Sequence, residues 1–174
     1  MPPADALAEH DLGHLYRSHL AMIRHRCRRI VGDGALADDL AQDVFVSYAE
    51  TYGRGRPPGN AAALLFTMAT RRALNALRDG RRRRARLDAE ADAASELALA
   101  RPDAGPAEAG LDVRRVLTEV DPELAAIAVY YFVDGMDQDE IAEVTALHRR
   151  TVSRRLEAFR EVAQKLLARP ARPA

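Results

Sequence analysis

The segment that most constrains the fold of this chain runs from Gly135 to Leu167 and predicts two helices joined by a tight turn. Asp137, followed three residues later by Glu140, forms a capping box, which marks the start of a short helix. After Arg149, apolar residues recur at steps of four and three and form one stripe on a longer helix: Val152, Leu156, Phe159, Ala163 and Leu166. A short helix, a tight turn and a longer helix predict a helix-turn-helix.

The longer helix has a basic first turn, and the face opposite its apolar stripe is polar. That face carries Arg150, Ser153, Arg154 and Glu157. In a helix-turn-helix the second helix lies in the major groove with its first residues at the base edges, where an arginine fork pairs with guanine acceptors. The pattern therefore predicts reading of duplex DNA. The alternative is an ordinary helical hairpin with a solvated charged face.

Composition favours an all-α chain of one or two small domains. The chain has 174 residues, of which 48% are hydrophobic and only 5% aromatic, and its formal net charge is zero. Its single cysteine, Cys27, lies on an apolar helical stripe, so we expect a buried thiol, no intrachain disulfide and a reducing cytoplasm. No apolar run is long enough to span a membrane, and the N-terminus has no signal-peptide core, which predicts cytoplasmic localisation without membrane insertion.

Three helices are predicted before the middle of the chain. Residues 1–10 read as a tail, and an apolar stripe then predicts a helix from Asp11 to the glycines at 32 and 34: Leu12, Tyr16, Leu20, Ile23, Cys27 and Ile30. The helix predicted over 35–52 buries Leu36, Leu40, Ala41, Val44 and Tyr48 and projects Asp38, Asp39, Gln42 and Asp43 on its other side. Composition alone favours a solvated acidic face, and the alternative is a docking surface for a basic partner.

The third predicted helix begins after a Gly- and Pro-rich loop over 53–59, with Asn60 as its cap, and reaches about Arg78. Thr67, Arg71, Asn75 and Arg78 line one polar face of it. Between Arg71 and Arg86 there are eight arginines and one acid, a density typical of a phosphate-binding surface. A disordered basic tail is the alternative, and it fits only the last part of this run.

A change in composition over 87–110 predicts a flexible linker, rich first in Ala, Asp and Glu and then in Pro and Gly. The helical pattern resumes at Leu111. Asp121 and Pro122 then predict a helix start, and Gly135 its end. The apolar residues expected to be buried in that helix are Leu124, Ile127, Ala128, Tyr131 and Phe132. Residues 169–174 read as a tail.

This order of segments resembles the bacterial sigma-70 family of RNA polymerase sigma factors, in its small extracytoplasmic-function (ECF) class. Residues 37–45 (ADDLAQDVF) are similar to the polymerase-binding segment of the family's region 2, and 64–84 to its −10-reading helix. Residues 137–156 are similar to the −35-reading part of region 4. The resemblance covers about 11–167 and implies region 2 over 11–86, the linker over 87–110 and region 4 over 111–168.

The resemblance implies three binding surfaces. Contacts with the β′ clamp helices of polymerase are expected from Asp38, Asp39, Gln42, Asp43 and Phe45. Contacts with the −10 strand are expected from Asn60, Thr67, Arg71, Asn75, Arg78, Arg81 and Arg82. Contacts with the −35 duplex are expected from Arg149, Arg150, Thr151, Ser153, Arg154, Arg155 and Arg160, the last two at phosphates.

The implied function is to bind core polymerase and direct initiation at −10/−35 promoters, in a stress- or signal-response regulon. The implied partners are the polymerase β′ clamp helices and β flap, promoter DNA and an anti-sigma factor. The free protein is expected to be a monomer, or a 1:1 complex with the anti-sigma factor. No cofactor, metal or catalytic residue is expected.

Two other classes of function were weighed against this one. A conventional regulator would bind a palindrome as a dimer without polymerase, but the acidic helix followed by a basic face disfavours it. An enzyme would need a phosphate loop, a nucleophile elbow or a metal motif, and none is found in the sequence. One further hypothesis concerns the acidic linker residues, which either occupy a basic polymerase channel or fold back on the arginine run: Asp88, Glu90, Asp92 and Glu96.

Overall fold

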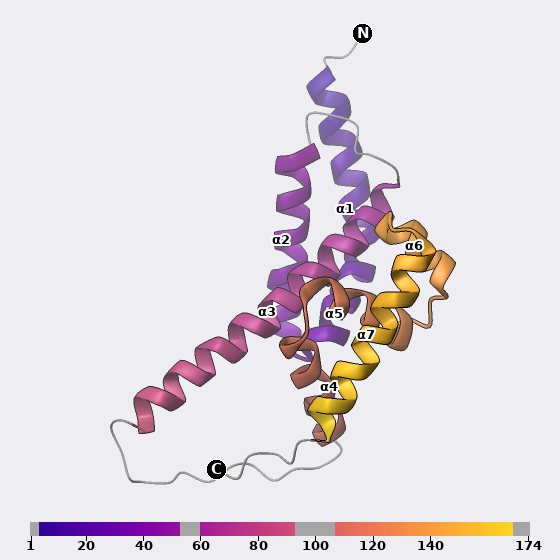
Figure 1. Ribbon diagram of the computed structural model, residues 1–174. Coiled ribbons are helices and arrows are strands. Elements are labelled where there is room, and N and C mark those ends of the chain that lie inside the picture. Colours follow the sequence, from indigo (N-terminus) through magenta and orange to yellow (C-terminus); the bar gives the residue numbers. More distant parts are fainter. Residues whose placement is uncertain (1–3, 53–59, 93–106, 169–174) are drawn as a thin grey trace. The chain divides into compact units, whose positions relative to one another are not determined.

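The computed structural model describes residues 4–52, 60–92 and 107–168, and all regular secondary structure within these ranges is helical (Figure 1). The predicted all-α fold class is therefore confirmed. The chain divides into two compact units, Met1–Ala73 with Ala142–Ala146, and Leu74–Ile141 with Leu147–Ala174. Each unit is described by itself.

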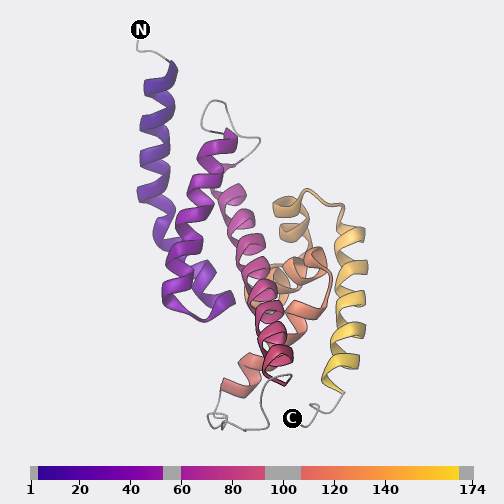
Figure 2. The same cartoon turned by 90° about the vertical axis from the view of Figure 1, so that its left-hand side faces the viewer.

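The first unit is built on a helical hairpin of α1 (Ala4–Val31) and α2 (Gly34–Tyr52), which lie side by side in both views (Figures 1 and 2). Gly32 adopts a φ of 80°, a left-handed conformation that ends α1 as predicted. Asp33 then caps α2 by accepting a hydrogen bond from the backbone N–H of Leu36 at 2.9 Å. Because α1 already begins at Ala4, most of the predicted N-terminal tail is helical.

The core of this hairpin differs from the predicted stripes at two positions. Leu36 and Tyr16, both expected to be buried, are 39% and 37% exposed. Ala37 and Phe45 lie in the core of α2 instead. Successive residues point about 100° apart around a helix, so a small rotation of the helix against its partner can bury the neighbour of a predicted core residue in place of that residue. Cys27 is fully buried as predicted, and desolvation raises the pKa of its thiol to about 11.

The third helix, α3 (Ala61–Asp92), is longer than the sequence predicted and takes part in both units. Its start is the predicted one, since the Asn60 side chain accepts a hydrogen bond from the backbone N–H of Ala62 at 2.9 Å. Its predicted end at Arg78 is wrong. Gly80 costs a helix only about 1 kcal/mol, and the arginines and alanines after it are good helix formers. The first residues of the predicted linker are thus helical, and residues 93–106 lie outside the described part.

The second unit also contains α4 (Ala107–Glu119), α5 (Pro122–Ala128), a π-helical segment η1 (Val129–Val133) and α7 (Arg149–Leu167). The helix α6 (Gln138–Thr145) begins in this unit, and its residues from Ala142 are assigned to the first unit. Asp121 caps α5 as predicted, because its carboxylate accepts hydrogen bonds from the backbone N–H groups of Glu123 and Leu124. The packed pairs within this unit include α5 with α7 and α4 with α7.

The segment η1 changes which aromatic residues are buried. The sequence predicted Tyr131 and Phe132 as core residues, but Val129 and Tyr130 are 1% exposed and Phe132 is 53% exposed. A π-helical turn holds more residues than an α-helical turn, so the side chains rotate out of the predicted stripe. Gly135, with a φ of 71°, follows this segment and ends it as expected.

None of the helices that the structure describes has the length and apolar character needed to cross a membrane.

Candidate protein and nucleic-acid interfaces

The acidic face of α2 contains two ion-paired carboxylates and two exposed polar side chains with no such partner. Arg24 donates two hydrogen bonds to Asp38, at 2.6 and 2.5 Å, and this arginine holds the pKa of the Asp38 carboxyl below its usual value. Asp43 pairs with Arg72 of α3 at 2.6 Å. Asp39 and Gln42 are exposed and make no ion pair or side-chain hydrogen bond with the residues that the structure describes.

Phe45, predicted to touch polymerase, is 5% exposed, so burial limits direct contact. Its ring packs edge-on against Tyr16, with 4.8 Å between the ring centroids. Beside it runs an open groove between α1 and α2, which Tyr16, Gln42 and Val46 also line. Val46 is 56% exposed and was missed in the sequence. The sequence signal that could have identified Val46 is that it is apolar but lies outside the predicted buried stripe of its helix.

Among the residues predicted to bind the −10 strand, Arg71, Asn75 and Arg82 are exposed on α3. Thr67 is only 9% exposed, and its hydroxyl donates to the carbonyl of Ala63 at 2.9 Å. The spacing that suggested a polar face for Thr67 therefore places it at the edge of the core. Asn60 is exposed, with its side-chain oxygen engaged as the helix cap.

Arg78 and Arg81, also predicted to bind the −10 strand, contact the end of α4 within the second unit. Arg78 is half-buried and donates long hydrogen bonds to the carbonyls of Leu117 (3.5 Å) and Val120 (3.4 Å). Burial lowers the pKa of its guanidinium from the usual value. Arg81 pairs with Glu119 at 2.5 Å and also donates to the Thr118 hydroxyl at 2.9 Å.

The helix-turn-helix, α6 followed by α7, has the capping box that the sequence predicted. The Asp137 carboxylate accepts from the backbone N–H of Glu140 at 2.9 Å, and Glu140 accepts from that of Asp137 at 2.8 Å. Ala146 takes a left-handed φ of 56° in the turn. His148 caps α7, its Nδ1 accepting from the backbone N–H of Arg150 at 3.2 Å. These local contacts fix where the basic first turn of α7 begins.

Arg150 and Arg154 lie exposed on the predicted DNA-reading face of α7. Neither forms an ion pair with any residue in the described ranges. Arg149, on the same turn, pairs with Asp139 of α6 at 3.1 Å. The face forms a shallow polar depression lined by His148, Arg150, Thr151, Ser153, Arg154 and Glu157.

Arg155 and Arg160, predicted to contact phosphates, turn toward the supporting helices instead. The Arg155 guanidinium pairs with Glu123 of α5 at 2.5 Å. That of Arg160 lies over the rings of Tyr131 and Phe132, 5.6 and 5.8 Å from their centroids. In this structure the two side chains join α7 to α5 and η1.

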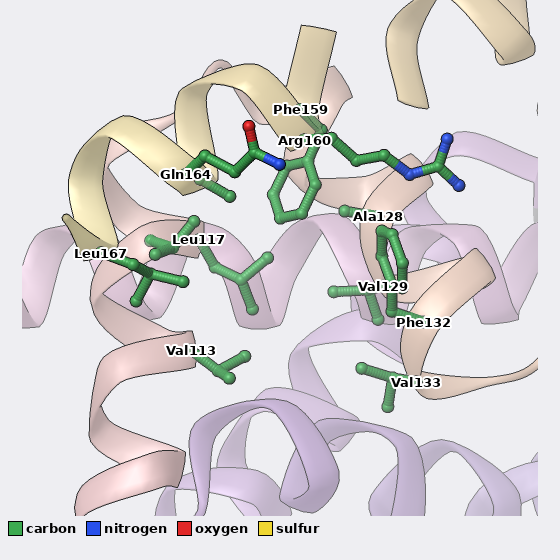
Figure 3. A pocket seen from close by; sticks show the side chains of 12 residues that line it. Val113, Leu117, Ala128, Val129, Phe132, Val133, Phe159, Arg160, Gln164 and Leu167 are labelled. Carbon is green, nitrogen blue, oxygen red and sulfur yellow. The ribbon is translucent and has the colours of Figure 1, made fainter. Parts of the chain in front are cut away.

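An apolar groove of about 380 Å³ lies on the second unit between α4, α5 with η1, and α7 (Figure 3). The side chains of Val113, Leu117 and Leu167 enter it from α4 and α7, and the rings of Phe132 and Phe159 lie 5.8 Å apart beside it. Val113, Phe132 and Leu167 are each more than half exposed. The sequence analysis did not predict this surface. A possible signal was that these segments carry more apolar residues than a single buried stripe on each helix accounts for.

Within the described ranges no group of three or more His, Cys, Asp or Glu residues is placed to hold a metal ion.

Comparison with known proteins agrees with this arrangement. A family model described as Sigma-70 region 2 matches residues 15–83, and one described as ECF sigma factor matches residues 60–169. RNA polymerase sigma factor CarQ of Myxococcus xanthus is 29% identical over 163 residues, which cover 87% of this chain and 88% of CarQ. The sigma factor RpoE, in a co-crystal structure with the anti-sigma factor NepR from Bartonella quintana, is similar at a TM-score of 0.48 and 20% identity, covering 90% of this chain and 96% of RpoE.

The helix-turn-helix and the region 2 match define a regulatory protein of transcription initiation. The chain belongs to the ECF sigma factor family, whose model spans well over half of it. It is thus an RNA polymerase sigma factor, and the resemblance stated from its sequence is confirmed.

Proposed function

We propose that this sigma factor binds core polymerase through α2, reads −35 duplex DNA through α7 and binds the −10 strand through α3. The observation that carries the proposal is that one chain exposes polar side chains on an acidic helix and arginines on a basic helix, and that these side chains form no ion pair with the described residues. Asp39 and Gln42 are exposed between the ion-paired Asp38 and Asp43 on α2, and Arg150 and Arg154 are exposed on the basic turn of a helix-turn-helix. We further propose that the protein acts in the cytoplasm, where polymerase works, and that it serves a stress or signal response.

Asp39 and Gln42 are the strongest candidates for polymerase contact, because binding there breaks no ion pair among the residues that the structure describes. Asp38 and Asp43 are tied to Arg24 and Arg72, so they contribute mainly by their negative field. The exposed apolar surface of Val46 and Tyr16 beside Gln42 adds area that a docking partner would bury.

Promoter reading is assigned to two surfaces. Arg150 and Arg154 are the candidates for base contacts in the −35 duplex, with Thr151 and Ser153 beside them. Arg71, Asn75 and Arg82, exposed on α3, are the candidates for the −10 strand together with residues 53–60. Only residue 60 of that loop lies in the described part of the chain.

The apolar groove on the second unit is the surface that we assign to the polymerase β flap. Val113, Phe132 and Leu167 at this groove are more than half exposed although the unit has its own core, and exposed apolar side chains gathered in one place are typical of a protein-binding site. An anti-sigma factor that covers this groove or the α2 face would exclude polymerase from the same surface. The free protein is proposed to be a monomer.

The test is co-elution of the full chain with sigma-free core polymerase on a sizing column. The variant is Asp39→Arg/Gln42→Ala, which leaves the pairs of Asp38 and Asp43 intact. Glu161→Arg, an exposed acid on α7, is the matched charge-reversal control. We expect the control to co-elute and the double variant to elute alone. A wild-type chain that binds DNA but not core would favour the conventional regulator and overturn the proposal.

A further inference from the structure

Arg78 and Arg81, two of the α3 arginines that the sequence resemblance assigns to the −10 strand, are occupied by the end of α4. Both Arg78 and Arg81 lie in the part of α3 that belongs to the second compact unit, as does all of α4. Arg78 also donates to the Asn75 side chain on its own helix at 3.3 Å. The partners of Arg78 and Arg81 at the end of α4 lie 34 to 42 residues further along the chain, so these contacts are tertiary rather than local.

The chemistry of the α4 end explains why arginines bind there. The last carbonyls of a helix have no partner within the helix and carry the negative end of its dipole. Arg78 donates to the carbonyls of Leu117 and Val120, and Arg81 donates to that of Arg115 at 3.3 Å. Glu119, whose side chain is 28% exposed, adds a full negative charge against Arg81. The end of α4 thus presents carbonyl and carboxylate oxygens to the same guanidinium groups that a phosphate would use.

We propose that the C-terminal end of α4 is an autoinhibitory element, which holds Arg78 and Arg81 away from DNA in the free protein. This inference rests on the proposed binding of the −10 strand by α3 and extends that role to Arg78 and Arg81. DNA must compete with Glu119, Thr118 and the α4 carbonyls, so the free sigma factor binds single-stranded DNA more weakly than its exposed arginines alone would allow.

The test uses the full chain and a fluorescein-labelled single-stranded oligonucleotide of mixed sequence, with the dissociation constant measured by anisotropy in low salt. Glu119→Gln removes the charge that holds Arg81 and keeps the shape of the side chain. Glu161→Gln makes the same change of net charge on an exposed site of α7. We expect Glu119→Gln to bind about three- to fivefold more tightly than Glu161→Gln, the factor that corresponds to loss of one partly exposed ion pair.

Arg81→Ala in each background separates this inference from the proposed function. In the Glu119→Gln chain, Arg81→Ala should weaken binding, because the released arginine contacts phosphate. In the Arg81→Ala chain, Glu119→Gln should have no more effect than Glu161→Gln. Thr118→Val, which removes only the hydroxyl that accepts from Arg81, should tighten binding by a smaller factor.

Each remaining outcome overturns one of the two claims. In one outcome, Glu119→Gln and Glu161→Gln bind DNA equally, and Arg81→Ala weakens binding in the Glu119→Gln chain. This result would rule out autoinhibition by α4 and would support DNA binding by Arg81. In the other outcome, Arg81→Ala leaves the DNA affinity of the Glu119→Gln chain unchanged. This result would rule out DNA binding by Arg81 and would therefore overturn the inference.

Discussion

The C-terminal half of α3 and the N-terminal half of α7 are both rich in arginine, yet their side chains have different surroundings. On α3, Arg78 and Arg81 are held by carbonyl and carboxylate oxygens of α4. On α7, Arg150 and Arg154 are exposed and form no ion pair with the described residues. A high density of arginines therefore predicts a basic helix, but it does not predict which guanidinium groups are available to DNA.

The same contrast recurs within α7 itself. Arg154 and Arg155 are adjacent in sequence but point about 100° apart around the helix. Arg155 pairs with Glu123, whereas Arg154 lines the polar depression at the DNA-reading face. The helical period, rather than the residue type, separates the reading arginines from the supporting ones.

The largest expected effect is loss of DNA affinity when the exposed arginines of α7 are removed. Arg150→Ala and Arg154→Ala should each weaken binding to a promoter duplex by about 1–3 kcal/mol, because each removes a potential bidentate base contact. The −35 sequence is first mapped with the reconstituted holoenzyme. The dissociation constant for a labelled duplex of that sequence is then measured by fluorescence anisotropy. Arg160→Ala is the matched control on the same helix, and a loss there as large as at Arg154 would contradict the assignment of the face.

A second expected effect is on stability and concerns the held arginines of α3. Arg78→Ala should lower the free energy of unfolding by about 1–2 kcal/mol, because it leaves half-buried carbonyls at the end of α4 without their charged donor. Urea unfolding followed by circular dichroism measures the change. Arg83→Ala, exposed on the same helix, should change stability by less than about 0.5 kcal/mol. Equal losses in the two variants would show that Arg78 is not held.

The turn that positions the exposed arginines can be weakened without touching them. Asp137→Ala should cost about 1 kcal/mol of unfolding free energy, because it removes the side-chain acceptor for the backbone N–H groups of Asp139 and Glu140. The measurement is again urea unfolding, with Asp137→Asn as a conservative variant that keeps a capping oxygen. A larger loss for Asn than for Ala would argue against the capping role.

The smallest expected effect concerns the supporting pair on α7. A double-mutant cycle of Arg155→Ala and Glu123→Ala should give a coupling of less than about 1 kcal/mol, since the Glu123 side chain is 59% exposed and solvent screens the pair. The coupling should fall as salt is raised from low to physiological ionic strength. A coupling that does not respond to salt would mean that packing, not charge, joins these residues.

Local features of the fold were predictable from sequence to the residue. The Asp137–Glu140 capping box, the Asp121 cap and the Asn60 cap all form as expected. The buried residues Val152 and Leu156 of α7 also follow the predicted stripe. Each of these features depends on residues within a few positions of one another, so the spacing in the sequence carries the whole geometry.

The candidate site was predictable only in part. Asp39, Gln42, Arg150 and Arg154 are exposed as the resemblance implied, whereas Phe45 and Thr67 are buried. The apolar groove with Phe132 escaped prediction because a π-helical turn shifts the stripe, and no local pattern in the sequence marks that turn.

The sequence by itself determined the all-α class, the starts of α3, α5, α6 and α7, the helix-turn-helix and membership of the sigma factor family. Only the tertiary structure decided which charged side chains are free, because the partners of Asp43, Arg78, Arg81 and Arg155 lie 29 to 42 residues away along the chain. Periodicity assigns a side chain to a face of its own helix. What that face meets depends on how helices distant in sequence pack, and that packing determines whether an arginine binds protein or remains available for DNA.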